Sequence, residues 1–559
     1  MTNAALSDQL NLYSKLMDIH GENDFKVKSY ANAAFQLDRY PNELSALTLE
    51  QIAGIRGIGK SIAQDVSALI QTNELPSLNL LLQNTPAGIL ELMKIKGIGP
   101  KKIRTIWKEL QIETPGELLY ACNENRLIHY KGFGAKTQKT IQEAVEFFLA
   151  NQGRYLYATM IPIAQGLKRH LENMFSEIPL ELTGAFIRQE DIIDQVEFVI
   201  ALDPDLIIEA LEQEGNFEFQ REEAGTLYFL FDGKLHIEIT PCDEEQFVST
   251  LFFTTNSSAF NECFQEEFPD VDYTIPVASE ETYFEQANIP YIPPCLRNDS
   301  LSVELAKEDN LPELIQPNDV MGVIHNHSTW SDGEETIEAM ANECIRLGYE
   351  YLVMSDHSVT SFYANGLSVD RIYQQHEEID RLNEKLFPFK IFKSIECDIL
   401  SEGQLDYSDD VLASFDLVIA SIHQNLNMTE EKAMKRILRA IENPFTTILG
   451  HPTGRLLLSR KGYPLNFEEV LQHCAKHKVV VEINANPRRL DLDWTFIQLA
   501  KKYNVLLSIN PDAHSLKGIQ DIGYGVLAAQ KGGLTQQDNL SSLPLTSFEQ
   551  FLHAQKNKY

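Results

Sequence analysis

The stretch GVIHNHSTWSDG, residues 322–333, joins an apolar strand pattern to three potential metal ligands. Its apolar start is typical of a buried strand, and this strand runs into His325 and His327. Side chains two residues apart lie on the same face of a strand, so we expect both imidazoles to point the same way. Asp332 follows in a Ser-Asp-Gly turn. Two histidines and a carboxylate in this arrangement predict a metal site at the end of the strand.

Five further apolar runs in the last third of the chain end in the same manner. They are EYLVMSDHS (350–358) with Asp356 and His357, FKSIECDIL (392–400) with Glu396, LVIASIHQN (417–425) with His423, TILGHPTGR (447–455) with His451, and VLLSINPDAHS (505–515) with Asp512 and His514. Helical segments separate these runs, as in a βα barrel that gathers its catalytic groups at the carboxyl ends of its strands. A single histidine at a strand end is usually structural, but six of the 14 histidines occupy these positions. His473 and His477 lie in a helical stretch instead, and we expect them at the surface.

These residues resemble the ligand set of the PHP (polymerase and histidinol phosphatase) family, and the resemblance covers residues 320–559. It implies a distorted (βα)7 barrel that holds two or three divalent metals. Mn²⁺, Zn²⁺ or Fe²⁺ suit a mixture of imidazole and carboxylate ligands. The implied first site consists of His325, His327, Glu396 and Asp512. Glu396 would be shared with a second site at His423 and His451, and a third site would use Asp332, His357 and His514.

The chemistry implied by such a cluster is phosphoester hydrolysis. Two close cations lower the pKa of water and neutralise phosphoryl oxygens, so the protein needs no nucleophile of its own. We expect Glu396, Asp512 and His357 to be catalytic, and Asp356 to orient His357 as a hydrogen-bond partner. Candidates for binding the substrate phosphate are Arg455, Arg488 and Arg489.

Three local repeats in the first 150 residues share a Gly-apolar-Gly turn followed by a helix. They are GIRGIGKSIAQDV (54–66), KIKGIGPKKIRTI (94–106) and HYKGFGAKTQKTI (129–141). Glycines allow a tight turn and close backbone approach, and the N–H groups that begin the next helix attract anions. The repeats resemble helix-hairpin-helix motifs, which bind DNA through its backbone and without sequence preference. The residues expected to contact DNA are Gly57, Gly59, Lys60, Gly97, Gly99, Lys101, Lys102, Gly132, Gly134 and Lys136.

The first 300 residues more broadly resemble a bacterial family X DNA polymerase. FKVKSYANAA (25–34) is similar to the N-terminal helix pattern of that family, and IPPCLRND (292–299) is similar to the end of its thumb domain. The family holds Mg²⁺ on three aspartates of its palm domain. Aligned from Gly184, the aspartate pair falls on Gln195 and Glu197, and the third carboxylate falls near His236 or Glu238. We therefore expect a palm that has kept its fold and lost polymerase activity.

The resemblance and the motifs together predict a multidomain α and α/β protein. The expected domains are an N-terminal helical domain with the first hairpin (1–85), a fingers-like helical domain with two more hairpins (86–150), a degenerate α+β palm (151–240), a thumb-like domain (241–300), a linker (301–319) and the PHP barrel (320–559). The net charge of −34 is unevenly distributed. Residues 1–150 hold 16 basic and 16 acidic side chains, whereas residues 151–300 hold 7 and 29. The first 150 residues are thus the part that suits a phosphate backbone.

The combination of hairpins and barrel predicts a DNA-binding phosphoesterase, with 3′–5′ exonuclease activity or 3′-end and abasic-site processing in DNA repair. One alternative is a phosphatase that acts on a small monoester such as histidinol phosphate. Another is a DNA-binding scaffold or a polymerase that is still active. No apolar run reaches the roughly 18 residues that a membrane span needs. We expect a cytoplasmic monomer that does not enter membranes and whose seven scattered cysteines are reduced.

Overall fold

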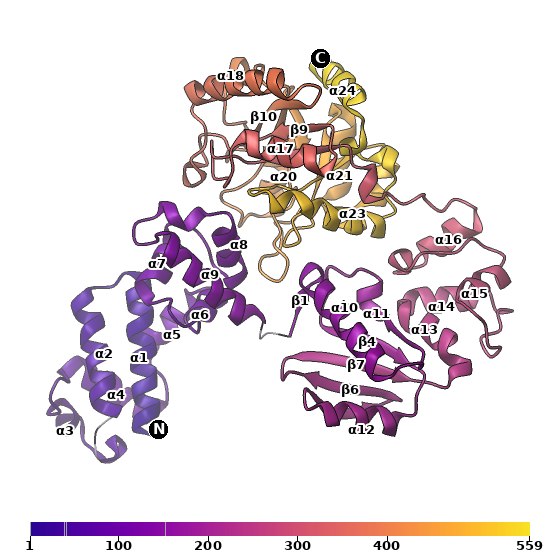
Figure 1. The fold of residues 1–559 in the computed structure, drawn as a ribbon. Coiled ribbons are helices and arrows are strands. Elements are labelled where there is room, and N and C mark those ends of the chain that lie inside the picture. The colour runs from indigo at the N-terminus through magenta and orange to yellow at the C-terminus, as the bar shows by residue number, and fades with distance from the viewer. Residues whose placement is uncertain (1, 39, 41, 151–152, 559) are drawn as a thin grey trace. The chain divides into compact units, whose positions relative to one another are not determined.

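The computed structural model describes residues 2–38, 40, 42–150 and 153–558, and the chain divides into two compact units between residues 149 and 150. The first unit is helical, which confirms the class predicted for this region (Figure 1). One hydrophobic core extends from Leu6 to Leu78, and a second contains Ile19 and residues from Ile89 to Val145. The helices are α1 (Asn3–His20), α2 (Asp24–Asp38), α3 (Leu49–Ala53), α4 (Lys60–Thr72), α5 (Pro76–Gln83), α6 (Ala87–Leu92), α7 (Pro100–Lys108), α8 (Pro115–Asn123) and α9 (Ala135–Ala150).

The second unit begins with a five-stranded mixed sheet in the order β2-β4-β7-β6-β5. Its strands are β2 (Leu180–Thr183), β4 (Gln195–Ile200), β5 (Phe217–Glu223), β6 (Thr226–Phe231) and β7 (Leu235–Pro241). Strands β4 and β7 run parallel, and the other neighbours are antiparallel. The sheet shares a core with helix α10 (Tyr157–Met174) and helix α12 (Pro204–Glu214), while the short helix α11 (Gly184–Ile187) follows β2. A two-residue ribbon pairs β1 (Tyr155–Leu156) with β3 (Ile192–Ile193).

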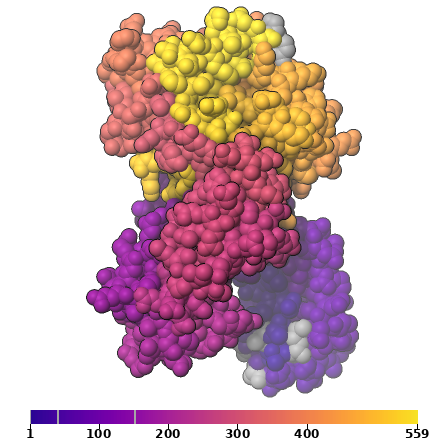
Figure 2. Space-filling view, turned by 90° about the vertical axis from the view of Figure 1, so that its right-hand side faces the viewer, coloured from indigo at the N-terminus to yellow at the C-terminus, as the bar shows by residue number. Residues whose placement is uncertain are grey.

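A helical segment with an aromatic core follows the sheet. Its helices are α13 (Phe247–Thr255), α14 (Ser258–Glu267), α15 (Glu281–Gln286) and α16 (Leu301–Lys307), and Figure 2 shows the segment in rose as one packed body. Phe252, Phe264 and Phe284 pack edge to face at its centre. Helix α16 lies in the stretch 301–319 that we expect to be a linker. Its residues Val303 and Ala306 are buried in this aromatic core, so the helix packs with the segment before it.

The last part of the chain is a barrel of seven parallel strands in the order β14-β13-β12-β11-β10-β9-β8. Most of its strands are completely buried, as the continuous apolar runs predicted. The backbone N–H of His327 donates to the carbonyl of Ala513 at 2.9 Å, and this contact brings the two edge strands together. The predicted distorted (βα)7 barrel is therefore confirmed (Figure 1).

The barrel strands and their helices alternate along the chain. The strands are β8 (Gly322–Asn326), β9 (Tyr351–Met354), β10 (Lys390–Asp398), β11 (Leu417–Ser421), β12 (Thr446–Leu449), β13 (Val480–Asn484) and β14 (Leu507–Asn510). The helices are α17 (Ile337–Leu347), α18 (Val369–Leu386), α19 (Asp409–Leu412), α20 (Glu430–Ile441), α21 (Phe467–His477), α22 (Ile497–Lys502), α23 (Ile522–Lys531) and α24 (Leu545–Lys556). Among the described residues, no helix has both the length and the apolar character that crossing a bilayer requires.

Candidate metal centre

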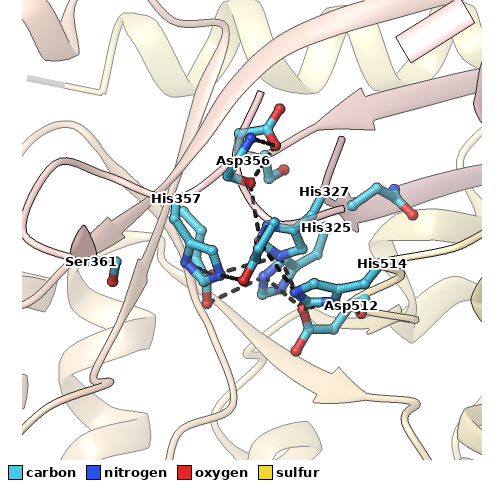
Figure 3. Close-up of polar contacts among 12 residues, drawn as sticks. His325, His327, Asp356, His357, Ser361, Asp512 and His514 are labelled. Atoms are coloured by element: carbon cyan, nitrogen blue, oxygen red, sulfur yellow. Dashed lines mark hydrogen bonds and ion pairs between the residues drawn. The ribbon is translucent and has the colours of Figure 1, made fainter. Parts of the chain in front are cut away.

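All nine predicted ligands lie at the carboxyl ends of barrel strands. His325 and Glu396 belong to strands β8 and β10, and the others stand in the loops that follow β8, β9, β11, β12 and β14. Parallel strands bring their carboxyl ends to one rim of a barrel, which explains why residues so far apart in sequence converge. Figure 3 shows the side chains of His325, His327, His357, Asp512 and His514 directed toward one another.

Glu396 stands at the centre of the cluster. Its Oε1 atom lies 3.2 Å from Nε2 of His325, 3.0 Å from Nε2 of His423 and 2.9 Å from Nε2 of His451. Its Oε2 atom lies 2.9 Å from Nδ1 of His357. One carboxylate thus reaches imidazoles that come from four different strand ends, which is the arrangement needed to share it between two cations.

Two further carboxylates complete the cluster. Asp512 Oδ1 lies 3.0 Å from Nε2 of His327 and 3.5 Å from Nε2 of His325. Asp332 lies 3.6 Å from Nε2 of His357 and 3.5 Å from Nε2 of His514.

The donor atoms form three groups small enough to hold an ion. The groups are His327, Asp332, His357 and His514; His325, His327 and Asp512; and His357, Glu396 and His423. These groups are close to the expected sites, but His327 and His357 each belong to two of them. The reason is that the imidazoles of His327 and His357 stack, with ring centroids 4.4 Å apart.

Several donor atoms in the cluster are buried and make no hydrogen bond of good geometry among the described residues, although polar neighbours lie close to them. They include Nε2 of His325, Oδ2 of Asp332 and Oε2 of Glu396. A buried polar atom left in this state costs about 1–3 kcal/mol. A bound divalent cation would satisfy these atoms, and imidazole with carboxylate is a donor set that transition metals accept. The residues present therefore fit a metal centre.

Glu396 and His327 have pKa shifts that favour their metal-binding protonation states, whereas the neighbouring carboxylates raise the pKa of three other histidines of the cluster despite their burial. Burial alone would raise the pKa of Glu396, but His423, His325 and His357 hold it well below its usual range. Burial and the neighbouring His514 and His357 lower the pKa of His327 to about 3. At neutral pH this imidazole is therefore neutral, which is the form that binds metals.

Two buried carboxylates contact the predicted ligand histidines on the side away from the cluster, and neither is among the residues predicted from the sequence. Glu482 Oε2 lies 2.6 Å from Nδ1 of His325. Asp398 Oδ1 lies 3.0 Å from Nδ1 of His423. Such contacts select the tautomer that presents Nε2 to a metal. A charged residue inside the apolar run VVVEIN was the signal for Glu482, and the ECD triplet was the signal for Asp398.

Asp356 has a different place from the one expected. Its carboxylate accepts hydrogen bonds from the backbone N–H groups of Ser328 and Ser331, at 2.8 and 3.1 Å, and from the side chain of Gln375. No contact with His357 is found among the described residues, because adjacent side chains of an extended chain point to opposite sides. Asp356 therefore holds the turn that precedes Asp332 (Figure 3).

The three arginines expected at the substrate phosphate differ in their surroundings. Arg455 is engaged by two carboxylates, since it pairs with Asp493 and lies 3.2 Å from Asp191. These contacts neutralise its charge, so its placement does not support a role in phosphate binding. Arg489 is buried, with Nε 3.8 Å from Oδ2 of the predicted ligand Asp512. Arg488 is half-buried in the same loop.

The three Gly-apolar-Gly turns have nearly the same backbone conformation. Gly57, Gly97 and Gly132 have φ values of +90°, +95° and +94°, a region that favours glycine. The second glycine comes directly before α4, α7 or α9. Lys101 is 76% exposed at the start of α7, and its contact with Asp24 is long, at 3.9 Å. Each turn thus leads into the amino end of a helix, with lysines close by.

The palm-like sheet brings the degenerate polymerase positions together. Gln195 and Glu197 on β4 pair in register with His236 and Glu238 on β7. The Oε2 atom of Glu197 accepts a hydrogen bond from the backbone N–H of Ala185 at 2.7 Å. Within the part of the chain that the structure describes, the groups of side chains that could hold a metal all lie in the barrel.

A parallel barrel with a central His/Asp/Glu cluster defines a metal-dependent hydrolase of the PHP type. The models of three families match the chain: a helix-hairpin-helix domain at residues 1–75, a SAM-like helix-hairpin-helix tandem at 89–146, and the PHP domain at 324–486. The chain is 33% identical over 554 residues to the DNA polymerase/3′-5′ exonuclease PolX of Bacillus subtilis (strain 168), and the match covers 96% of each protein. The chain therefore belongs to the PolX family, which confirms the resemblance to family X polymerases with a PHP domain.

The barrel also matches shorter proteins. A probable phosphatase of Thermoanaerobacter sp. (strain X514) is 27% identical over 252 residues, which is 42% of this chain and 95% of that protein. A probable phosphatase of Syntrophotalea carbinolica (strain DSM 2380 / NBRC 103641 / GraBd1) is 26% identical over 224 residues, or 38% of this chain and 88% of that protein. The predicted hydrolase class is confirmed.

Proposed function

We propose that the barrel hydrolyses phosphodiester bonds at DNA 3′ ends, as a 3′–5′ exonuclease or in 3′-end and abasic-site processing during DNA repair. The observation that carries the proposal is the position of Glu396, whose carboxylate contacts His325, His357, His423 and His451. The hairpin turns in the same chain support DNA as the substrate, and so does the similarity to a named 3′–5′ exonuclease.

The residues of the cluster would hold two or three divalent cations, for which Mn²⁺, Zn²⁺ and Fe²⁺ are the candidates. The chemistry that such cations supply is the activation of water near neutral pH and the neutralisation of charge on the phosphoryl group. Glu482 and Asp398 keep His325 and His423 in the orientation that binds a metal. Asp356 holds the turn that carries Asp332.

Arg489 is the arginine that we assign to the substrate phosphate. Its Nε atom lies 3.8 Å from Oδ2 of the predicted ligand Asp512. Its guanidinium group would offset phosphoryl charge beside the cluster. Arg488 lies in the same loop and keeps the same predicted role.

The proposal for DNA binding is that the three hairpin turns contact the phosphate backbone without reading sequence. Open geometry supports it, since no heavy atom beyond the adjoining residues lies within 4 Å of the Cβ position at Gly97, Gly99, Gly132 or Gly134. A phosphate group can therefore approach these turns closely. We also propose a cytoplasmic monomer, and the free state of the seven cysteines supports the location.

Polymerase activity is proposed to be lost. Gln195 offers an amide where Mg²⁺ prefers an anionic oxygen, and Glu197 is already bound to the backbone N–H of Ala185. The excess of acidic residues across 151–300 would also repel a triphosphate and a template.

One experiment separates the DNA substrate from the small-monoester alternative, which the similarity to probable phosphatases favours. The purified full-length protein is incubated with Mn²⁺ and either a 5′-labelled duplex with a recessed 3′ end or histidinol phosphate. We expect a ladder of shortened DNA strands and slow release of phosphate from histidinol phosphate. Rapid dephosphorylation of histidinol phosphate with intact DNA would favour the alternative.

A further inference from the structure

The loop that follows His357 exposes two apolar side chains, and it lies at the rim of the barrel that carries the predicted ligands. We call residues 358–367 the Phe362 loop. Phe362 is 70% exposed and Val359 is 45% exposed. Single exposed apolar residues are common on protein surfaces. This loop differs from most exposed loops because hydrogen bonds to neighbouring segments fix its backbone.

The Phe362 loop is held in place at several points. The N–H of Val359 donates to the hydroxyl of Tyr407 at 3.0 Å, and the N–H of Thr360 donates to Oδ2 of Asp406 at 2.6 Å. The amide of Gln424 donates to the carbonyl of Thr360 at 3.0 Å. An apolar side chain on a fixed loop is pre-organised, so a ligand that packs on it does not have to order the loop.

The buried side of the same loop supports a predicted metal ligand. The hydroxyl of Ser361 donates to Oδ2 of Asp398 at 2.5 Å, and Asp398 in turn holds His423. The hydroxyl groups of Ser361 and Tyr363 are 3.3 Å apart, and both residues are buried. Phe362 lies between these two anchored residues in the sequence, and its ring is exposed to solvent. The loop follows β9 at the rim of the barrel that carries the predicted ligands.

We propose that Phe362 stacks on the base of the 3′-terminal nucleotide whose phosphodiester bond is cleaved, with Val359 extending the apolar surface. This inference rests on the proposed function. Every base has a π-face, so stacking on an aromatic ring suits an enzyme that must accept any sequence. The base is joined to the scissile phosphate through a single sugar, so a phosphate held at the cluster places the base near the rim. Two side chains are far too small an area for a stable protein partner, which needs about 1,200 Å² or more.

The barrel provides a matched control for this proposal. Phe387 is 84% exposed and lies between the end of α18 and the start of β10. Glu396 lies near the carboxyl end of β10, so Phe387 is at the opposite rim of the barrel. Replacing Phe387 removes a similarly exposed ring that cannot reach the substrate.

The test compares full-length wild type with Phe362→Ala, Phe362→Tyr and Phe387→Ala on two DNA duplexes. One duplex ends in a normal 3′ nucleotide, and the other carries an abasic 3′-terminal sugar. We expect Phe362→Ala to lower kcat/KM on the normal end by about 5- to 150-fold, the range that base–aromatic stacking spans. Phe362→Tyr should keep activity because it retains the ring, and Phe387→Ala should behave as wild type. On the abasic end, all four proteins should be equally active.

The outcomes separate this inference from the proposed function. Wild type that trims DNA, together with Phe362→Ala that trims the normal end as fast as wild type does, overturns the stacking role alone. An equal loss on the normal and abasic ends also overturns it, because the defect then does not involve the base. Wild type that leaves both duplexes intact overturns the proposed function and this inference with it.

Discussion

The Nδ1 atom of His325 lies 2.6 Å from the Oε2 atom of Glu482, and both side chains are completely buried. Glu482 also accepts hydrogen bonds from the amides of Asn484 and Asn510, at 2.9 and 2.8 Å, and from the N–H of His451 at 3.1 Å. These donors fix the carboxylate, and the carboxylate fixes the His325 ring. The Nε2 atom of His325 consequently faces Glu396 and Asp512.

Glu482→Gln should weaken metal binding without unfolding the barrel. The amide keeps the shape of the side chain but removes the charge that orients His325, and changes to such partners typically cost 10- to 100-fold in metal affinity or activity. Titration of the chelator-treated protein with Mn²⁺ would measure the affinity, and circular dichroism would check the fold. Glu468→Gln, on the solvent side of α21, is the control. An unchanged affinity for Mn²⁺ would argue against a role for Glu482.

Glu396→Gln should lower the phosphoesterase activity by several orders of magnitude. This carboxylate is the one that contacts His325, His423 and His451 together, so its loss removes negative charge from more than one cation. Metal analysis by mass spectrometry and hydrolysis of an aryl phosphate would be measured together. The control is His473→Ala, because His473 lies on α21 and contacts the backbone of Glu469. Full activity with Glu396→Gln would refute the proposed centre.

His423→Ala or His451→Ala should be rescued in part by excess Mn²⁺. Each variant removes one ligand and leaves Glu396 with its other partners, so higher metal concentration can restore occupancy by mass action. Activity is measured across a Mn²⁺ titration.

A chelator should inactivate the wild type reversibly, since the cluster needs no protein nucleophile. Activity that persists after chelation would contradict this expectation.

Lys101→Glu combined with Lys102→Glu should weaken DNA binding by the full-length protein. Both residues lie in the first turn of α7, beside the turn that contains Gly97, and reversing their charge repels a phosphate backbone. Fluorescence anisotropy at several salt concentrations gives the affinity, and the salt dependence should become less steep in the variant. Lys435→Glu, 70% exposed on a barrel helix, is the control. Wild-type binding that does not respond to salt would count against backbone recognition.

The protein should not extend a primer. Gln195 cannot replace an anionic ligand, and Glu197 is bound to Ala185 in the palm-like sheet. Incorporation of labelled nucleotides opposite a template would be assayed with Glu396→Gln, so that the barrel does not degrade the product. Template-dependent synthesis that disappears in a further Glu197→Gln variant would show that the palm is still active.

The barrel, its nine candidate donors and the three glycine turns could be predicted from the sequence alone. Each depends on a short local pattern: an apolar run that ends in His, Asp or Glu, or a Gly-apolar-Gly turn before a helix. Alternating strands and helices of this kind have one common way to bring strand ends together. The donors of the cluster are therefore readable one segment at a time.

The buried groups that support the donors become visible only when the whole chain is folded. Glu482 and His325 are 157 positions apart in the chain, and they meet because barrel closure brings β13 and β8 to the same rim. The same holds for Arg455, which is bound by Asp191 of the palm-like part rather than being open to substrate. In the sequence, Phe362 resembles any other loop residue. The structure shows that its neighbours Ser361 and Tyr363 are buried and hydrogen-bonded, which fixes the loop. Contacts between distant segments depend on how the whole chain packs, and no local pattern encodes them.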